Sequence, residues 1–577
     1  AGRHDQVNAA GTFAAGGTLN VSFISPFVPI PANTFTIATS TGATSGTFAT
    51  VNWPAGYGGT VTYNANSIVL SNIAALAPAV TTNAATAVVF NGATLNGAAN
   101  PNGTATTGYF RYSTTDPGTC NDSFGTRAPS SGGSALGSGF APVAFSNAIA
   151  GLTPLTTYYY CAIASNTGGT AFGAVLSFTT PAFPCTPPNI TYVDDNWAGT
   201  ALGDDPDAGG PATSFGCDSF ATLQGGIAGV TTGGTVNVYA GTYTEIGQIV
   251  VNKDVTVVGA DRATTIIKPA ADTGSSGDLA GWFLIDATRT FNISGVTLDG
   301  TGRMVWHALR YHGSGTVNNV AFLNIKFEES GPAYRGGGVY IDTGVVNVTN
   351  STFNGMGRFG VLGGAFGAPA SGTISGNTYT GKGAGNWLDY AFDIEYGSNF
   401  TINNNTVSGN IGVATSDGSD SAGISIWGDT GTIANLTGNT ITGNTTGIAL
   451  AMVGEVGPAV TITSNVITGG SYGVGVQDVF GPESPTLIIS GSTITNNTVA
   501  GIWVAPDMGT ANMNIHHNRI VGNGDGAVMG VAPPLRMIAP SDNLRTRKQK
   551  AVAGTSETLV VENNWWGCNE GPAPGNT

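Results

Sequence analysis

The chain has 577 residues, of which only 9% are charged and 88 are glycine, whereas ordinary soluble domains carry about 25% charged residues. A net charge of −15 and a pI near 4.5 argue against nucleic acid as a partner, because binding it needs a basic face. Few Lys and Glu residues leave the chain short of helix formers, while Gly, Thr, Asn and Val suit strands and tight turns. The composition therefore predicts an all-β fold, and the length predicts several domains.

A small β unit is predicted over residues 1–75. Apolar and polar residues alternate there in four stretches, 16–24, 33–40, 45–54 and 59–73. The segments 4–23 and 48–70 resemble the closing unit of the strand-rich passenger repeats found in autotransporter-type bacterial surface proteins. The resemblance implies an N-terminal β unit of a bacterial surface protein.

A sandwich of two sheets is predicted over residues 76–182. Its candidate strands include 85–100, 107–115, 156–166 and 174–181. The run LTPLTTY that ends at Tyr158 resembles the immunoglobulin-like fibronectin type III family. There a Leu-x-Pro-x-Thr-x-Tyr run places a corner tyrosine whose hydroxyl bonds to the backbone, and the resemblance implies this role for Tyr158.

A right-handed parallel β-helix is predicted over residues 183–577, with a capping region at 183–233. The runs YVDDNW (192–197) and FATLQ (220–224) lead into GGTVNVYAGTYTE (233–245). They resemble the first coil of the pectate-lyase-like superfamily of right-handed parallel β-helix proteins, over about residues 190 to 570. The resemblance implies a strand or short helix that caps the first coil, and it implies the fold alone, because fold does not determine function.

Ten short segments in this part share one alternating pattern, an apolar residue, then Asn, Gly or Ser, another apolar residue, and then Gly or Asn. Their anchor positions are Val296, Val320, Ser351, Asn377, Asn405, Asn439, Asn465, Ser492, Asn518 and Asn564. The anchors are 24 to 34 residues apart, and the last spacing is 46. A repeat of this length predicts a solenoid of roughly a dozen coils, since one unit cannot bury its apolar face alone.

The repeat predicts two columns of side chains. Asn377, Asn405, Asn439 and Asn465 are expected to form a hydrogen-bonded ladder along one corner, because parallel stacking places equivalent residues about 4.8 Å apart. The apolar residues two places after each anchor are expected to fill the core. They are Leu298, Phe322, Phe353, Tyr379, Val407, Ile441, Ile467, Ile494, Ile520 and Trp566.

Candidate catalytic carboxylates lie in the run WLDYAFDIEY (387–396). Asp389, Asp393 and Glu395 are an even number of residues apart, so a strand would project them to one face. Glycoside hydrolysis needs two carboxyl groups, one as acid and one as base or nucleophile. A calcium-assisted lyase would instead need oxygen ligands beside a basic residue. The paired Asp-Asp and Gly-His-Gly signatures of polygalacturonase-like enzymes and the Arg-x-Pro-x-x-Arg run of pectate lyases do not occur.

Aromatic residues near these acids are candidates for carbohydrate contact, by stacking on sugar rings. They are Trp387, Tyr390, Tyr396 and Trp427. Asp417, Asp420 and Asp429 follow in the next coil, where they are expected to approach the same acids. An ordinary exposed sheet has the same composition, so a plain surface is the alternative.

The densest acidic stretch is a candidate calcium site. Its members are Asp194, Asp195, Asp204, Asp205 and Asp207. Calcium prefers several oxygens from a flexible loop, and glycines interrupt this stretch. It does not match the EF-hand pattern, which ends in a Glu at the twelfth position. A solvated acidic loop is the alternative, and no other cofactor is predicted.

Five cysteines without a CxxC pair argue against zinc and for disulfides. Cys120 with Cys161, and Cys185 with Cys217, are the expected pairs, which favours an extracellular location. Cys568 is left over, so we expect its partner beyond Thr577. The missing signal peptide predicts a processed secreted product, and the sequence has no segment apolar enough to span a membrane.

The sequence favours a structural, non-enzymatic role. We expect a secreted bacterial cell-surface protein, either an adhesin-like stalk or a self-assembling fibre or sheath subunit. Its partners would be another copy in a head-to-tail filament or a surface glycan, since open solenoid ends are templates for pairing. The alternatives are a polysaccharide lyase or hydrolase that acts along the β-helix groove and a calcium-dependent carbohydrate-binding protein. A basic run within a predicted insertion loop at about 528–556 is interpreted as solvated.

Overall fold

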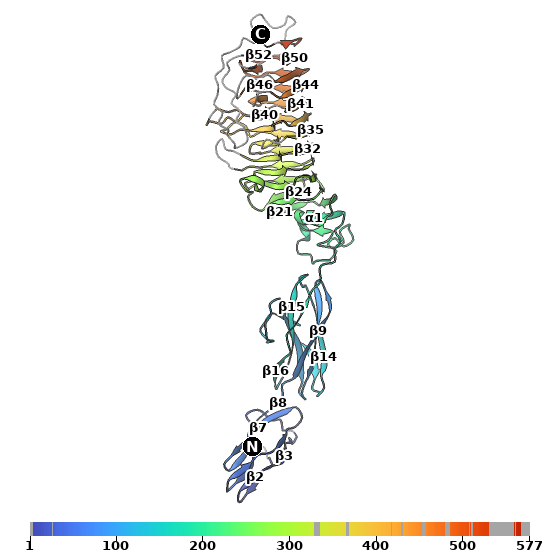
Figure 1. Cartoon of the computed structure of the whole chain (residues 1–577), viewed down its shortest axis with the longest axis vertical. Coiled ribbons are helices and arrows are strands. Elements are labelled where there is room, and N and C mark those ends of the chain that lie inside the picture. Colours follow the sequence, from blue (N-terminus) through green and yellow to red (C-terminus); the bar gives the residue numbers. More distant parts are fainter. Residues whose placement is uncertain are drawn as a thin grey trace. The chain divides into compact units, whose positions relative to one another are not determined.

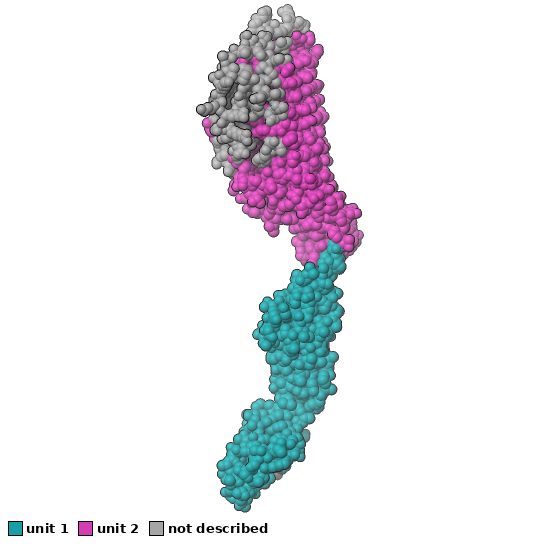
Figure 2. Space-filling model, in the orientation of Figure 1, with its two compact units in different colours: residues 1–185 teal, residues 186–577 magenta. Residues whose placement is uncertain are grey.

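The computed structural model divides the chain into two compact units, Ala1–Cys185 and Thr186–Thr577, coloured teal and magenta in Figure 2. It describes residues 4–25, 27–327, 335–364, 369–416, 418–428, 431–452, 457–478, 485–506, 508, 512–529, 559 and 561–566. Regular structure in these ranges is nearly all β, which confirms the predicted fold class.

Three pairs of short parallel strands begin unit 1. Strands β1 (Val7–Ala9), β2 (Phe13–Ala15) and β3 (Thr18–Asn20) pair with β4 (Phe35–Ser40), β5 (Thr44–Gly46) and β6 (Thr50–Asn52), respectively. The antiparallel hairpin of β7 (Tyr57–Asn64) and β8 (Ser67–Ala75) then extends the sheet at β4. One turn of chain therefore stacks on the next around a small core of Ala15, Ala38 and Ile68.

Two antiparallel sheets form the rest of unit 1. The first sheet contains β9 (Ala79–Val89), β10 (Gly92–Asn100) and β14 (Val143–Ala150). The second contains β11 (Thr106–Ser113), β12 (Thr126–Ala128), β13 (Ser134–Gly137), β15 (Thr157–Asn166), β16 (Gly169–Phe172) and β17 (Leu176–Thr179). Leu95, Phe110, Phe145 and Tyr160 are buried in one shared core, so the two sheets pack as a sandwich.

The Tyr158 hydroxyl lies at a corner of this sandwich. It accepts a hydrogen bond of 3.0 Å from the backbone N–H of Thr153, five residues upstream. The ring of Tyr158 stacks on that of Phe178, with 5.7 Å between the ring centroids. The crossing segment before β15 is therefore fastened to the strand that follows it.

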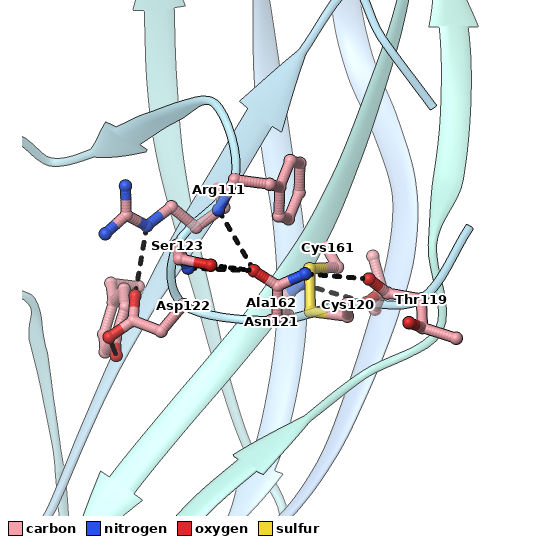
Figure 3. The surroundings of a disulfide bond; sticks show 11 residues. Arg111, Thr119, Cys120, Asn121, Asp122, Ser123, Cys161 and Ala162 are labelled. Carbon is pink, nitrogen blue, oxygen red and sulfur yellow. Dashed lines mark hydrogen bonds and ion pairs between the residues drawn. A yellow bond between two sulfur atoms is a disulfide. The ribbon is translucent and has the colours of Figure 1, made fainter. Parts of the chain in front are cut away.

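A long loop of the sandwich is fastened covalently. Cys120, between β11 and β12, forms a disulfide with Cys161 in the middle of β15, with 6.0 Å between their Cα atoms (Figure 3). Next to it, Asp122 accepts hydrogen bonds from the Tyr109 hydroxyl at 2.8 Å and from Arg111 Nε at 3.0 Å. Cys185 and Cys217 are also disulfide-bonded, so the structure has the two disulfides that the sequence predicts.

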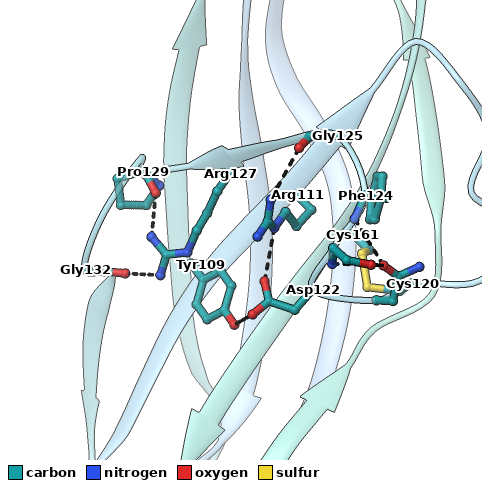
Figure 4. Close-up of polar contacts among 12 residues, drawn as sticks. Tyr109, Arg111, Cys120, Asp122, Phe124, Gly125, Arg127, Pro129, Gly132 and Cys161 are labelled. Carbon is teal, nitrogen blue, oxygen red and sulfur yellow. Dashed lines mark hydrogen bonds and ion pairs between the residues drawn. A yellow bond between two sulfur atoms is a disulfide. The ribbon is translucent and has the colours of Figure 1, made fainter.

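Polar contacts hold the same side of the sandwich (Figure 4). The Arg127 guanidinium lies 4.0 Å from the centre of the Tyr109 ring and donates hydrogen bonds to the carbonyls of Pro129 and Gly132. Burial raises the pKa of Tyr109 to about 12, and the neighbouring Asp122 carboxylate raises it further. Tyr109 therefore stays a neutral hydrogen-bond donor over the physiological range.

We expect the double substitution Cys120→Ser and Cys161→Ser to destabilise the sandwich without affecting the solenoid. The two cysteines are 41 residues apart, and a cross-link over a loop of this length contributes about 2–4 kcal/mol by restricting the unfolded chain. Calorimetry of the full chain should show one transition moved to lower temperature. An unchanged thermogram would contradict a stabilising role for this disulfide.

Three parallel sheets, here named A, B and C, form the solenoid of unit 2, and each coil contributes one strand to each sheet (Figure 1). Sheet A is β19 (Ser219–Phe220), β18 (Ile190–Val193), β20 (Gly234–Val238), β23 (Val255–Gly259), β26 (Thr290–Ser294), β29 (Ser314–Asn318), β32 (Gly344–Thr349), β35 (Ala370–Ser375), β38 (Asn399–Asn403), β41 (Ile433–Thr437), β44 (Ala459–Thr463), β47 (Thr486–Ser490), β50 (Met513–His516) and β53 (Val561–Glu562). Sheet B is β21 (Gly241–Glu245), β24 (Thr265–Pro269), β27 (Thr297–Asp299), β30 (Ala321–Leu323), β33 (Thr352–Asn354), β36 (Thr378–Thr380), β39 (Thr406–Ser408), β42 (Thr440–Thr442), β45 (Val466–Thr468), β48 (Thr493–Thr495) and β51 (Arg519–Val521).

Sheet C is β22 (Ile249–Val251), β25 (Gly281–Ile285), β28 (His307–Tyr311), β31 (Gly337–Ile341), β34 (Phe359–Gly363), β37 (Tyr390–Glu395), β40 (Ala422–Gly428), β43 (Thr446–Met452), β46 (Tyr472–Asp478), β49 (Ala500–Val504) and β52 (Asp525–Met529). Two short 3₁₀ turns, η1 (Asp195–Trp197) and η2 (Gly277–Ala280), lie outside the sheets. The chain is thus a right-handed parallel β-helix over most of unit 2, which confirms the predicted architecture.

A short helix covers the first coil. In α1 (Leu223–Gly229), Leu223 and Ile227 are buried against the solenoid core. The buried Glu245 carboxylate accepts hydrogen bonds from the N–H groups of Leu223 at 2.6 Å and Gln224 at 3.1 Å. A carboxylate at this position satisfies the free amides of the first helical turn and complements the helix dipole.

The repeated apolar residues fill the interior of the solenoid. Residues from Leu298 to Ile520 in the predicted column are at most 1% exposed, and Trp566 is partly buried against the same core. The rings of Phe322 and Phe353 stack almost in parallel, with their centroids 4.7 Å apart. This distance matches the spacing between neighbouring strands, so the strand register determines the packing.

A ladder of asparagines runs along the corner before sheet B. Asn377 Nδ2 donates to Asn405 Oδ1 at 3.0 Å, Asn405 to Asn439 at 2.9 Å, and Asn439 to Asn465 at 2.9 Å. Each amide also donates to a backbone carbonyl of the preceding coil, for example Asn439 to Ile402 at 2.8 Å. These buried amides therefore satisfy the turn backbone as well as one another.

We expect Asn439→Ala to lower the free energy of unfolding of the solenoid by about 3 kcal/mol or more, because its neighbours above and below lose hydrogen-bond partners in a buried site. The exposed Asn399 on β38 offers a matched control, for which Asn399→Ala should change stability by less than about 0.5 kcal/mol. Thermal unfolding of the full chain measures both. Equal melting temperatures for the two variants would contradict a stabilising ladder.

Candidate functional site

The outer face of sheet C is the candidate site. Every residue of β28, β31, β34, β37 and β40 is buried, so both faces of these strands are covered. The inner face joins the solenoid core through residues such as Val339, Phe392 and Ile424. The outer face carries a separate apolar cluster that includes Tyr340, Tyr390 and Trp427, and ionisable side chains lie among these rings.

Strand register brings these side chains together from different coils. Asp393 of β37 pairs in register with Ser425 of β40, and Glu395 pairs with Trp427. Neighbouring parallel strands are about 4.8 Å apart, so each pair is in side-chain reach. We use the name acid–arginine site for Tyr340, Arg358, Tyr390, Asp393, Glu395, Ser425 and Trp427.

Asp393 and Glu395 are the centre of the acid–arginine site. Both residues are 1% exposed, and Asp393 Oδ1, Glu395 Oε1 and the Ser425 hydroxyl are buried without a hydrogen-bond partner. Burial raises the pKa of Asp393 to about 7, against the opposing effect of Ser425 and Arg358. Burial also raises the pKa of Glu395 well above its ordinary value, and the charge of Asp393 raises it further. The pair therefore retains protons that ordinary carboxyl groups lose.

Arg358 supplies the positive charge of the site. It directly precedes β34, is 8% exposed, and its guanidinium lies 5.4 Å from the Phe359 ring centre and 6.0 Å from that of Tyr390. Its charge lowers the pKa values of Asp393 and Glu395, in opposition to the larger effect of burial. Arg358 Nε and Nη2 are nevertheless buried without a hydrogen-bond partner.

Asp389, the third candidate acid, lies apart from this pair. Its carboxylate accepts hydrogen bonds from the Tyr379 hydroxyl and from the N–H of Lys382, the latter at 2.7 Å. The strict alternation that the sequence predicts is broken because the consecutive residues Ala391 and Phe392 both join the solenoid core. Asp389 is therefore directed toward the interior, whereas Asp393 and Glu395 face outward.

Lys382 also belongs to this interior group. Burial lowers its pKa to about 8, although Asp389 favours the charged form. Its Nζ donates to the carbonyls of Gly357 and Leu388, the latter at 3.2 Å. We assign Asp389 and Lys382 to the support of the turn before β37.

The four predicted carbohydrate-contact residues separate in the same way. Tyr390 and Trp427 are buried on the outer face of sheet C. Trp387 donates from its indole N–H to the Gly383 carbonyl at 3.2 Å, and Tyr396 is a half-buried residue with a positive φ just after β37. Burial raises the pKa of Asp420 to about 6. Asp417 and Asp429 lie outside the described residues.

A second polar cluster lies on the same face, two coils nearer the cap. His312 Nδ1 is 3.0 Å from Asp342 and its Nε2 is 2.9 Å from Asp278, while Arg310 Nε is 2.9 Å from the same oxygen of Asp342. His307 stacks on Tyr340, with 3.7 Å between the ring centroids. Burial, with the charge of Arg310, lowers the pKa of His307 well below its ordinary value. Tyr340 thus connects this cluster to the acid–arginine site.

The acidic stretch of the capping region uses its oxygens on the backbone. Asp194 caps η1, Asp195 accepts from the N–H of Thr242 at 2.9 Å, and Asp205 and Asp207 accept from nearby loop amides. Among the described residues, no three His, Cys, Asp or Glu side chains converge as a metal site would require. Calcium binding stays a prediction. Cys568 and most of the predicted 528–556 loop, with its basic run, lie outside the described residues.

Sequence reasoning missed Tyr340, Arg358 and Ser425. They lie in three different coils, and only the register of sheet C shows that they share a face with Asp393. Arg358 sits one residue before a strand that carries no polar side chain, so no local pattern marks it. Its burial is the signal, and burial appears only in three dimensions.

The comparisons with known proteins agree with the fold. Residues 307–505 and 422–565 match the family model described as right handed beta helix region. No curated protein sequence matches the chain. In the part of the chain that the structure describes, no helix has the length and apolar character that crossing a membrane requires.

Solved structures with the same type of fold include three of different activity. The family 28 exopolygalacturonase of Yersinia enterocolitica is 11% identical, with 77% of this chain and 94% of that chain covered and a TM-score of 0.28. The A-module of the Azotobacter vinelandii mannuronan C-5 epimerase AlgE6 is 16% identical, with coverages of 52% and 88% and a TM-score of 0.27. The sensor domain of the anti-sigma factor RsgI4 of Pseudobacteroides cellulosolvens is 17% identical, with coverages of 19% and 94% and a TM-score of 0.14.

The double substitution Asp393→Asn and Glu395→Gln should raise the melting temperature of the solenoid by a few degrees at pH 8. Because both pKa values are raised in the folded state, the folded protein binds more protons than the unfolded chain above about pH 4, and its stability falls as pH rises through about 7. The gain in the variant should therefore shrink toward pH 4. A melting temperature that falls equally at both pH values would contradict the raised pKa values.

Proposed function

We propose that the chain is a polysaccharide-active enzyme that hydrolyses glycosidic bonds at the acid–arginine site. The observation that carries the proposal is the pair Asp393 and Glu395, two carboxyl groups on one face of one strand whose pKa values are raised by burial. Strongly perturbed pKa values cluster at functional sites. Two carboxyl groups that differ in protonation are what glycoside hydrolysis requires.

The two acids have separate tasks in this proposal. Near neutral pH the pair releases its first proton, so one carboxylate and one carboxylic acid coexist. Glu395 gives its proton to the glycosidic oxygen as the bond to the anomeric carbon breaks. Asp393 takes a proton from the water that attacks the same carbon. The pair as a whole keeps its single proton.

Aromatic rings beside the acids support a sugar as the ligand. Tyr340, Tyr390 and Trp427 are buried around them, and the Trp427 indole N–H is without a hydrogen-bond partner. Flat rings with a polar edge suit sugars, which present both C–H faces and hydroxyl groups. A lyase is disfavoured because Lys382 Nζ is engaged by two backbone carbonyls.

We further propose a surface location and a spacer role for unit 1. The antiparallel pairing and the Thr153–Tyr158 hydrogen bond support a fibronectin type III-like sandwich, and the parallel pairs of β1 to β6 support a closing unit like those of autotransporter passengers. Two disulfides support an extracellular location. The adhesin-like stalk, the fibre subunit and calcium-dependent carbohydrate binding stay predictions from the sequence.

We expect Asp393→Asn and Glu395→Gln each to lower the kcat of polysaccharide cleavage by at least about 100-fold, the usual scale for losing a positioned acid or base. Release of reducing ends from a panel of bacterial and plant polysaccharides measures it. Wild-type activity should rise as pH increases through about 7, because Asp393 must ionise to act as base.

Asp299 on β27 provides the control for this test. It pairs with Lys268 at 3.2 Å on sheet B, so Asp299→Asn should keep full activity. A wild-type protein that cleaves no polysaccharide of the panel, or a double variant as active as the wild type, would overturn the proposed function.

A further inference from the structure

Arg358 carries a hydrogen-bonding fork that no protein group uses. Its Nε and Nη2 are buried and have no hydrogen-bond partner. These two atoms lie on the same edge of the planar guanidinium and donate in parallel, the geometry that matches two oxygens of one carboxylate or sulfate. A buried donor without a partner is costly, by roughly 1–3 kcal/mol for a neutral group and more for a charged one. Such an edge therefore indicates a missing ligand.

The other buried cations of this face have protein partners. Arg310 forms an ion pair with Asp342 at 2.9 Å, and Lys382 donates to backbone carbonyls. Asp393 and Glu395 are close enough for the charge of Arg358 to change their pKa values, yet neither takes the free edge of its guanidinium. Arg358 is thus held beside the two acids with its donors available.

The surroundings hold the guanidinium in this position. The rings of Phe359 and Tyr390 lie 5.4 and 6.0 Å from it, and cation–ring contacts of this kind stabilise a guanidinium without using its N–H groups. Both rings are themselves buried. A fork placed in advance loses little side-chain entropy when it binds an oxyanion.

We propose that Arg358 binds an oxyanion of the substrate through Nε and Nη2, so that the site selects acidic glycans over neutral ones. This rests on the proposed function and assigns its substrate class. The oxyanion is a uronic acid carboxylate or a sulfate ester, which share two oxygens in the spacing the fork requires. Arg358 is the residue that determines specificity, and Asp393 with Glu395 carries the chemistry.

The test compares matched glycans on the full chain that carries Asp393→Asn and Glu395→Gln, so that binding is measured without cleavage. The probes are polygalacturonate and alginate with their carboxyl-reduced forms, and carrageenan with its desulfated form. Arg358→Lys keeps the charge but loses the fork, and Arg519→Lys is the matched control, since Arg519 also lies over a ring, 4.8 Å from that of Trp565 on sheet B. Titration calorimetry gives the dissociation constants.

At least one acidic glycan should bind at least 10-fold tighter than its neutral form, and Arg358→Lys should abolish that ratio, while Arg519→Lys leaves it unchanged. A preference for the uronates or for the sulfated probe identifies the oxyanion. Equal binding of acidic and neutral glycans, or a ratio that survives Arg358→Lys, overturns the role of Arg358 and leaves the proposed hydrolase standing. Binding of none of the probes overturns the assignment as well, and the reducing-end assay then decides the hydrolase separately.

Unchanged melting temperatures keep the comparison valid. Arg358→Met removes charge and fork together and should match Arg358→Lys in its loss of the ratio if the fork is what matters. If Arg358→Lys retains the ratio and Arg358→Met loses it, charge alone selects the ligand, and bidentate recognition is overturned.

Discussion

The in-register stacking of parallel strands is the constraint on which the solenoid depends. Each coil places every residue above its equivalent in the coil before, about one strand spacing away. A column must therefore be filled by side chains that tolerate their own kind, as the stacked Phe322 and Phe353 and the Asn377 to Asn465 ladder do. The same constraint brings Asp393 to Ser425 and Glu395 to Trp427 on the outer face of sheet C.

The outer face of sheet C is costly to build, and the rest of the solenoid offsets that cost. Asp393, Glu395 and Arg358 are removed from water without full compensation by hydrogen bonds. A continuous apolar core and satisfied amide ladders stabilise the coils that carry them. Sites that are less stable than they could be, within a stable scaffold, are typical of residues kept for function.

The sequence alone predicts the scaffold better than the site. Repeats anchored from Val296 to Asn564 predict strands, core and ladder, because each depends on a pattern local to one coil. The grouping of Asp389 with Asp393 was wrong in geometry, since Ala391 and Phe392 both face the core and reverse the alternation before them. Arg358 escaped prediction because its neighbours in the site come from other coils.

The shared proton of Asp393 and Glu395 is the central claim, and infrared difference spectroscopy tests it most directly. The carbonyl band of protonated carboxylic acids should persist above pH 6 in the wild type, lose intensity through about pH 7, and be absent in the Asp393→Asn, Glu395→Gln variant. Complete ionisation of all carboxyl groups below pH 5, with no difference between the two proteins, would contradict the account.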